Sequence, residues 1–353
     1  MVRAQNAFMQ TAAVILAAGT STRFGSPKQL APIGGRTMLD AVIGLARSSG
    51  LDPVIAVVPP DLSVPAGVLP ALNSAPSSGL SHSLRIGLAA VPSEIEAALI
   101  LLGDQPTMAL RTVRAVLAGA ANDRRVVAAR AEGRLGPPVL LRREAFAMAN
   151  VATGDEGLRA ILIDHPDLVT AVDVQLHAPD VDTLADLAAL GEPCLGCDAL
   201  FQPVRQDATH EYIGASPACW AAFGEVLARE FGDPGYGWIH RHTVDVYTVQ
   251  HPGLDERRQR QSVALHLIGL CHWLEHGMGA RELNPITQRL ASGDRDWPWF
   301  DPPVTYALTV RDVRAATTSA EHGALVRQWA EETWRAWAPH HELIRRWANE
   351  ALH

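Results

Sequence analysis

Short, uninterrupted apolar runs alternate with mixed stretches along the first half of the chain. The runs are Ala12–Ala18, Pro53–Val58 and Ala97–Leu102, and glycine or proline follows each of them. Runs of this length without polar alternation are typical of strands buried on both faces of a parallel sheet. Between the first two runs, Thr37–Ser48 carries apolar residues at helical spacing. This alternation predicts an α/β fold with a doubly wound, mostly parallel sheet.

The second half has a different pattern. Apolar residues recur at helical spacing in Ala218–Phe231, Arg257–His276 and Glu321–Leu352, the last of which is interrupted by Pro339. These segments predict a mainly α-helical C-terminal domain. Val244–Val249 is rich in β-branched residues, and we expect a short strand or an extended link there.

Composition separates the two halves as well. All nine tryptophans and all four cysteines follow Glu192, as do eleven of the fourteen histidines. We therefore place a boundary near Gly191–Asp198, which predicts one domain over residues 1–191 and a second over residues 192–353. A chain of 353 residues is long enough for two domains.

Charge and hydropathy exclude several classes of protein. The net charge of -8 disfavours a protein that coats nucleic acid with a basic surface. No apolar run approaches the ~20 residues that a membrane-spanning helix needs. Four cysteines in 353 residues do not make a disulfide framework, so we expect a cytoplasmic protein.

A glycine-containing loop follows the first apolar run. Residues 16–30 read LAAGTSTRFGSPKQL, in which Gly19 and Gly25 allow tight turns whose N–H groups can bind phosphate. Arg23 and Lys28 add positive charge. A plain strand-to-helix turn is the alternative. Lys28 is the only lysine among 30 basic residues, which favours a role for a compact ammonium group and hence phosphate binding.

A carboxylate follows the third apolar run, in the sequence Gly103-Asp104-Gln105-Pro106. Parallel strands end at the same edge of a sheet, so Asp104 faces the crevice of the glycine loop. A Mg²⁺ ion commonly uses one or two carboxylates together with substrate phosphates. Asp104 is therefore either a metal ligand or a cap of the next helix.

Residues 16–30 and the Gly-Asp-Gln-Pro segment resemble the nucleotidyltransferase family that makes dinucleotide forms of molybdenum cofactor. The matching segments that follow in the same order are Gly79–Leu84, Gly136–Leu141, Gly154–Gly157 and Asp180–Leu187. The resemblance covers roughly residues 11–190 and implies a Rossmann-like nucleotidyltransferase fold. Phe24 stands where the family more often has Met, and Pro137 departs from its usual pattern.

The resemblance also implies roles for individual residues. Arg23, Lys28 and Asp104 would be catalytic, and Asp104 and Asp182 would hold Mg²⁺. The nucleotide-binding residues would be Leu16, Ala17, Ala18, Gly19, Arg23, Lys28, Gly79, Ser83 and Gly103. Asp155 would either touch the acceptor or only make a turn, and His82 is a further candidate for a substrate contact.

The activity that the resemblance implies is Mg²⁺-dependent transfer of CMP from CTP to molybdopterin cofactor, with release of pyrophosphate. The Ala-Ala-Gly form of Ala17–Gly19 is typical of the cytidylyl branch and favours CTP over GTP. One alternative is another phosphorylated acceptor, such as a sugar or polyol phosphate. The other is a non-catalytic protein that carries or inserts the cofactor.

The C-terminal domain opens with Cys194-Leu-Gly-Cys197, which is either half of a zinc site or a redox pair. Zinc needs two further ligands. The candidates are Cys219, His210, His240 and His242. His272 and His276 are separated by one helical turn and form another candidate pair.

A polar set marks this otherwise apolar domain: His240, His242, Asp245, Gln250, His251, Gln261 and His266. It indicates either a small-molecule pocket or a hydrogen-bonded network that ties helices together. Three further segments, Thr209–Tyr212, Gln250–Gly253 and Gln261–Leu267, together with the Cys-Leu-Gly-Cys motif, resemble an uncharacterised bacterial family over roughly residues 194–350. This resemblance implies no activity. The fusion suggests that this domain receives, shields or delivers the product, or binds a molybdenum-dependent client enzyme.

Overall fold

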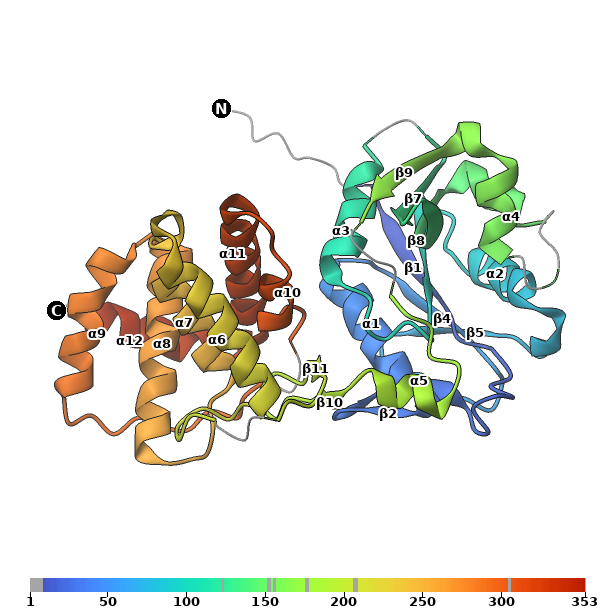
Figure 1. Cartoon of the computed structure of the whole chain (residues 1–353). Helices are drawn as coiled ribbons and strands as arrows, with labels where there is room; N and C mark the ends of the chain where they lie inside the picture. Colours follow the sequence, from blue (N-terminus) through green and yellow to red (C-terminus); the bar gives the residue numbers. More distant parts are fainter. Residues whose placement is uncertain are drawn as a thin grey trace. The chain divides into compact units, whose positions relative to one another are not determined.

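The computed structural model describes residues 9–121, 124–150, 154, 157–174, 178–205, 209–303 and 306–352. The chain divides into two compact units, Met1–Leu187 and Ala188–His353, which Figure 1 shows in a single view and which we describe one by one.

The first unit is built on a seven-stranded sheet with the order β5-β4-β1-β6-β8-β7-β9. The strands are β1 (Thr11–Leu16), β4 (Val54–Val58), β5 (Leu69–Leu72), β6 (Ala97–Leu102), β7 (Val126–Ala131), β8 (Arg134–Arg142) and β9 (Val169–Asp173). Only β8 runs antiparallel to its neighbours, β6 and β7. The predicted mostly parallel sheet is therefore confirmed, and the three apolar runs are its central strands β1, β4 and β6.

Helices cover both faces of this sheet (Figure 1). α1 (Met38–Ser48) and α3 (Leu110–Gly119) pack on the face that carries Ala13 and Ile15. α2 (Leu80–Ala89) and α4 (Gly157–Asp164) pack on the opposite face, which carries Val14 and Leu16. Because successive strand residues point to opposite faces, one continuous apolar run supplies both cores. The result is a doubly wound, three-layer arrangement.

This part of the chain also contains the short β2–β3 hairpin (Pro32–Ile33 and Arg36–Thr37). Helix α5 (Leu184–Ala189) begins in the first unit and ends in the second.

The central strands determine where a site can form. β1 and β6 pair in parallel, and Leu16 lies opposite Leu102 at their carboxyl ends. The glycine loop and the Gly103–Pro106 segment therefore leave the sheet side by side. In open α/β sheets, this edge is where ligands bind.

The second unit is mainly helical, as predicted. Its helices are α6 (Pro217–Gly232), α7 (His240–Gln250), α8 (Arg257–His276), α9 (Ala280–Ser292), α10 (Val310–Arg314), α11 (Ser319–Ala336) and α12 (His341–Glu350). A two-stranded sheet, β10 (Glu192–Pro193) and β11 (Leu200–Phe201), precedes them.

The expectation of a strand or link at Val244–Val249 is wrong, because this segment belongs to α7. Val246, Tyr247 and Val249 are fully buried there. Burial among the neighbouring helices α8 and α11 outweighs the preference of β-branched residues for strands.

Within the described residues, no helix combines the length and apolar character that crossing a membrane requires.

Candidate active site at the carboxyl edge of the sheet

A buried glutamine holds the glycine loop in place. The Gln29 side chain is only 3% exposed, and its Nε2 donates to the carbonyl oxygens of Ala17 (2.7 Å) and Gly19 (3.0 Å). The backbone N–H of Lys28 donates to the Ser21 hydroxyl at 3.0 Å. These bonds close the loop on itself, so that Lys28 is presented beside the end of β1.

Gly103 allows the two strand ends to meet closely. Its N–H donates to the carbonyl of Leu16 at 2.9 Å. A Cβ at this position would lie 2.7 Å from the Cβ of Ala17 and 3.2 Å from its Cα. Because these atoms belong to backbone or to a short side chain, they have little freedom to move, and glycine fits where larger residues would collide.

A third segment reaches the same edge from far along the chain. The N–H of Val181 donates to the carbonyl of Asp104 at 2.9 Å, which places Asp182 beside it. Thr183 and Asp186 then bond each other reciprocally, and Asp186 Oδ2 also accepts the N–H of Asp182 at 3.0 Å. This arrangement, of the capping-box type, fixes the backbone on which Asp182 stands.

Four charged side chains converge at this point. Lys28 Nζ donates to Asp104 Oδ2 and to Asp182 Oδ1, each at 2.8 Å. Arg23 Nη2 donates to Asp182 Oδ2 at 2.7 Å. The Lys28 side chain is 13% exposed and that of Arg23 is 70% exposed. The structure thus brings together the four charged residues that the sequence analysis singled out around this edge.

The cluster shifts the protonation of its members. Burial lowers the pKa of Lys28, but the hydrogen bonds and charges of Asp104 and Asp182 outweigh burial and leave the pKa above its usual value. The hydrogen bond from Lys28 lowers the pKa of Asp182, with further help from Arg23. At neutral pH, therefore, Lys28 is an ammonium group and Asp182 a carboxylate.

One oxygen in the cluster is left without a partner. Asp104 Oδ1 is buried and has no hydrogen-bond partner among the described residues. Buried acceptors normally have partners, so Asp104 Oδ1 is suited to bind a cation that comes from outside the protein. Asp104 and Asp182 together offer the hard oxygen ligands that Mg²⁺ uses.

Two further polar residues lie at this edge that the sequence alone did not indicate as site residues. One is Gln29, which holds the loop. The other is Asp180, whose Oδ1 accepts from Gln105 Nε2 at 2.9 Å. Burial, followed by the charge of Asp104, raises the pKa of Asp180. Both residues lie inside the quoted segments, but as single letters neither could be distinguished from ordinary loop residues.

The remaining predicted contacts lie on or near α2. Gly79 precedes the helix with a φ of 86°, and the buried Ser83 hydroxyl accepts from Asn73 Nδ2 at 3.0 Å. His82 lies on the same helix. Asp155 and Glu156 lie outside the described residues.

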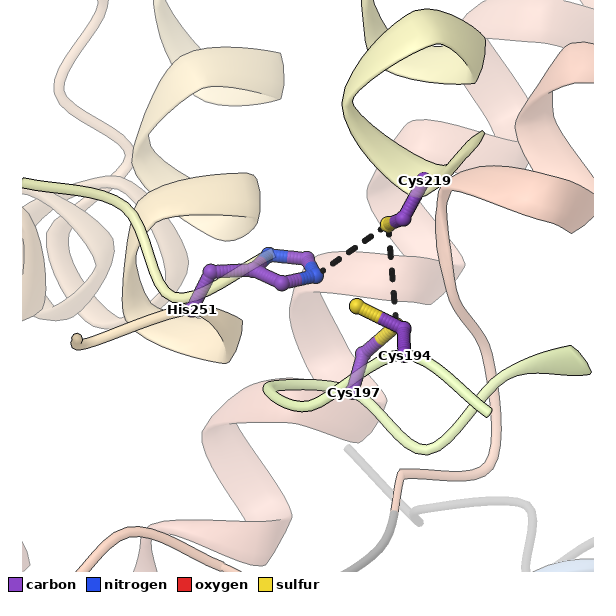
Figure 2. Close-up of side chains that lie close together, drawn as sticks. All are labelled: Cys194, Cys197, Cys219 and His251. Atoms are coloured by element: carbon purple, nitrogen blue, oxygen red, sulfur yellow. Dashed lines mark hydrogen bonds between the residues drawn. The ribbon is translucent and has the colours of Figure 1, made fainter. Parts of the chain in front are cut away.

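The second unit contains a separate cluster (Figure 2). Cys194, Cys197 and Cys219 lie together with His251, and all four are buried. The sequence analysis considered Cys219 as a partner of the Cys194–Cys197 pair, but it placed His251 only in the polar set.

The three histidines named above as candidate zinc ligands are engaged elsewhere. His210 contacts the rings of Tyr212 and Trp220, His240 Nδ1 bonds Glu230, and His242 stacks on Trp273. None of them belongs to the cysteine cluster as the structure describes it. For the second candidate pair, the ring centroids of His272 and His276 are 5.6 Å apart.

Most of the polar set makes hydrogen bonds that tie helices together. Asp245 accepts from Arg241 and bonds His266, and Gln250 Nε2 donates to Leu308 and Thr333. Gln261 Nε2 donates to the carbonyl of Ala291 at 3.1 Å. Of the two interpretations offered for this set, these contacts favour the network.

Within the polar set, His242 has a clearly shifted pKa. The residue is 2% exposed, and its ring stacks parallel to the ring of Trp273 with 3.8 Å between the ring centroids. Burial lowers its pKa to about 4; Asp245 opposes this shift, and Arg241 and Arg327 add to it. The imidazole is therefore neutral in the folded protein near neutral pH.

Comparison with known proteins agrees with the architecture of the first unit. Residues 13–169 match the MobA-like NTP transferase domain family. Residues 192–338 match a family of unknown function (DUF5946).

Two curated relatives are called bifunctional protein GlmU. The one from Hyphomonas neptunium is 37% identical over 113 residues, which are 30% of this chain and 24% of the relative. The one from Pelobacter propionicus is 35% identical over 147 residues, which are 38% of this chain and 32% of the relative. This chain thus spans a third or less of either relative.

Two solved structures are also similar. The homologue of Mycobacterium tuberculosis Rv0371c from Mycobacterium sp. strain JC1 is 28% identical, with a TM-score of 0.47, over 52% of this chain and 95% of its own. Rv0371c of M. tuberculosis H37Rv in complex with manganese is 27% identical, with a TM-score of 0.44, over 51% and 97%. In this chain, a segment that matches the MobA-like NTP transferase domain family (residues 13–169) is therefore followed by one that matches a family of unknown function (residues 192–338).

Proposed function

We propose that the first unit transfers CMP from CTP to the terminal phosphate of a molybdopterin-type cofactor and releases pyrophosphate. The observation that carries this proposal is the cluster of Lys28, Arg23, Asp104 and Asp182 at the carboxyl edge of a sheet in an NTP transferase domain. The Ala-Ala-Gly sequence at the end of β1 supports CTP as the nucleotide, through the resemblance stated above.

The proposed reaction balances as a single displacement. An oxygen of the acceptor phosphate attacks the α-phosphorus of CTP, the bond from that phosphorus to the bridging oxygen breaks, and pyrophosphate leaves. The acceptor phosphate is already ionised near neutral pH, so the reaction needs no strong general base. The protein has to align the two phosphates and stabilise the charge that develops between them.

Each charged residue has a part in this reaction. Lys28 and Arg23 would bind the phosphates of CTP. When no CTP is bound, Asp104 and Asp182 supply the negative charge that these two side chains contact. Asp104 and Asp182 would hold Mg²⁺, and the metal supplies charge neutralisation on the phosphates. The free Oδ1 of Asp104 fits this role.

Turnover tests the proposal directly. Pyrophosphate release should be measured with CTP, GTP or ATP, and with molybdopterin cofactor, a sugar phosphate or a polyol phosphate as the acceptor. We expect release with CTP and molybdopterin cofactor, and loss of release in Asp104→Asn. Asp164→Asn, an exposed carboxylate at the end of α4, is the matched control and should remain active.

The other outcomes each have a meaning. Release with a sugar or polyol phosphate alone would replace the acceptor. Release with GTP or ATP alone would replace the nucleotide. Cofactor binding without pyrophosphate release from any pair would favour a carrier or insertion protein over an enzyme.

A further inference from the structure

Four buried side chains from three separate segments meet in the second unit (Figure 2). Cys194 and Cys197 come from the loop between β10 and β11, Cys219 from the first turn of α6, and His251 directly follows α7. One ligand atom from each lies within 4.8 Å of every other, and none of the four residues is more than 2% exposed. Nothing described for the first unit uses these residues.

The spacing of the atoms matches a tetrahedron around a small cation. Zinc bonds of about 2.3 Å to sulfur and about 2.0 Å to nitrogen give edges of about 3.8 Å between sulfurs and about 3.5 Å between sulfur and nitrogen. Cys197 Sγ lies 3.9 Å from Cys219 Sγ, and Cys219 Sγ lies 3.3 Å from His251 Nε2. These two distances match the edges of a tetrahedral zinc site, and all four ligand atoms lie within 4.8 Å of one another.

The surroundings orient the ligands. His251 Nδ1 lies 2.7 Å from the carbonyl oxygen of Tyr247, so Nδ1 carries the proton and the lone pair of Nε2 faces the three sulfurs. The N–H of Ser216 points at Cys194 Sγ from 3.3 Å. A donor of this kind stabilises a thiolate, and zinc binds thiolates.

Gly196, one of the two residues between the cysteines of the loop, is also constrained. A Cβ on Gly196 would lie 2.6 Å from Cδ2 of His251 and 2.7 Å from the carbonyl oxygen of Gly214. Only glycine lets the loop approach the histidine this closely. The N–H of Asp198 donates back to the carbonyl of Cys194 at 2.9 Å, which closes the turn.

We propose that Cys194, Cys197, Cys219 and His251 bind one zinc ion as a structural site. All four positions of the tetrahedron are filled by protein and buried, so the site has no open position for a substrate or water. Each cysteine gives up its thiol proton to solvent when the metal binds, and no oxidant or reductant is needed. The zinc ties the loop that opens the second unit to α6 and α7.

The fourth cysteine offers a matched control. Cys271 is as buried as Cys219 and also lies in a helix. The carboxylate of Glu275, a neighbour of Cys271, is already hydrogen-bonded. Both of its oxygens accept from Arg345, and one also accepts from Trp334. We therefore expect Cys271→Ala to keep its zinc, whereas Cys219→Ala should lose it.

Metal content of the full-length protein is the first measurement. The protein should be purified without chelators from a zinc-containing medium and analysed by plasma mass spectrometry. We expect one zinc per chain in the wild type and in Cys271→Ala, and at least about tenfold less in Cys219→Ala. Gly196→Ala should also lower the zinc content, although it removes no ligand.

A second measurement does not depend on any variant folding. The wild-type protein, stripped with a chelator under reducing conditions, should be titrated with cobalt(II). A visible spectrum of tetrahedral cobalt with thiolate charge-transfer bands, abolished by one equivalent of zinc, supports the site. A reduced protein that binds neither metal, one equivalent of iron in the protein as purified, or a Cys194–Cys197 disulfide in its mass spectrum would overturn the proposal.

Discussion

Replacing Lys28 with methionine should change metal binding and turnover in opposite directions. Lys28 Nζ donates to Asp104 and Asp182, each at 2.8 Å, so the two accepting oxygens lie within about 6 Å of each other. Methionine matches the unbranched stem of lysine as far as Cε and removes the ammonium group, and with it the charge, between them. The two carboxylates then face each other without a cation.

The size of the effect follows from this geometry. Two unit charges about 6 Å apart repel by about 3 kcal/mol at an effective dielectric constant of ~20. In Lys28→Met, a divalent ion bound between Asp104 and Asp182 removes this repulsion. In the wild type, the same ion has to compete with the ammonium group of Lys28. In the absence of nucleotide, we expect Lys28→Met to bind Mn²⁺ about 10- to 100-fold more tightly than the wild type.

Turnover should fall in the same variant. The ammonium group would stabilise charge on the phosphates as the bond to pyrophosphate breaks, and loss of one such donor typically costs about 10²–10³ in kcat. Lys28→Arg is the control for charge. It should bind Mn²⁺ nearly as the wild type does, yet react slowly, because a planar guanidinium does not replace a compact ammonium.

The assays are Mn²⁺ titration followed by electron paramagnetic resonance, and pyrophosphate release. The melting temperature of each variant shows whether it is folded. A folded Lys28→Met protein that binds Mn²⁺ more weakly than the wild type, or that turns over at the wild-type rate, would refute this account of the cluster.

Two further predictions concern packing and pH. Gly103→Ala forces a Cβ against Ala17. It should destabilise the first unit by about 1–3 kcal/mol in urea denaturation and reduce turnover. If the variant were as stable as the wild type, the strand ends would not be tightly packed. His242 stays neutral in the folded protein down to about pH 4, whereas in the unfolded chain it binds a proton below pH ~6.5. The free energy of unfolding should therefore decrease by about 3 kcal/mol as pH falls from ~6.5 to ~4. His242→Gln should reduce that pH dependence. Equal pH dependence of the free energy of unfolding in the wild type and in His242→Gln would contradict the low pKa of His242.

The first unit was the easier part to predict from sequence. Its central strands are buried on both faces, so continuous apolar runs mark them unambiguously. Lys28 lies in the loop that follows the first of those runs, and Asp104 lies just beyond the end of another. The parallel register of β1 and β6 brings the two residues to one edge. Local sequence and the rules of sheet topology suffice for this much of the site.

Contacts between distant segments were harder to predict. Asp182 reaches the cluster through a backbone bond between Val181 and Asp104, and only a family resemblance indicated it. His251 joins the three cysteines because α7 ends beside them, and no regular spacing from Cys194 marks that position. The β-branched run in α7 predicted a strand or an extended link, but burial among helices determines its helical conformation.

The most direct test of the central claim is calorimetric titration of the full-length protein with CTP, GTP and ATP, each with and without Mg²⁺. We expect Mg²⁺-dependent binding of CTP that Asp104→Asn weakens and Asp164→Asn leaves unchanged. Failure of folded wild-type protein to bind any of the three nucleotides, with or without Mg²⁺, would contradict it.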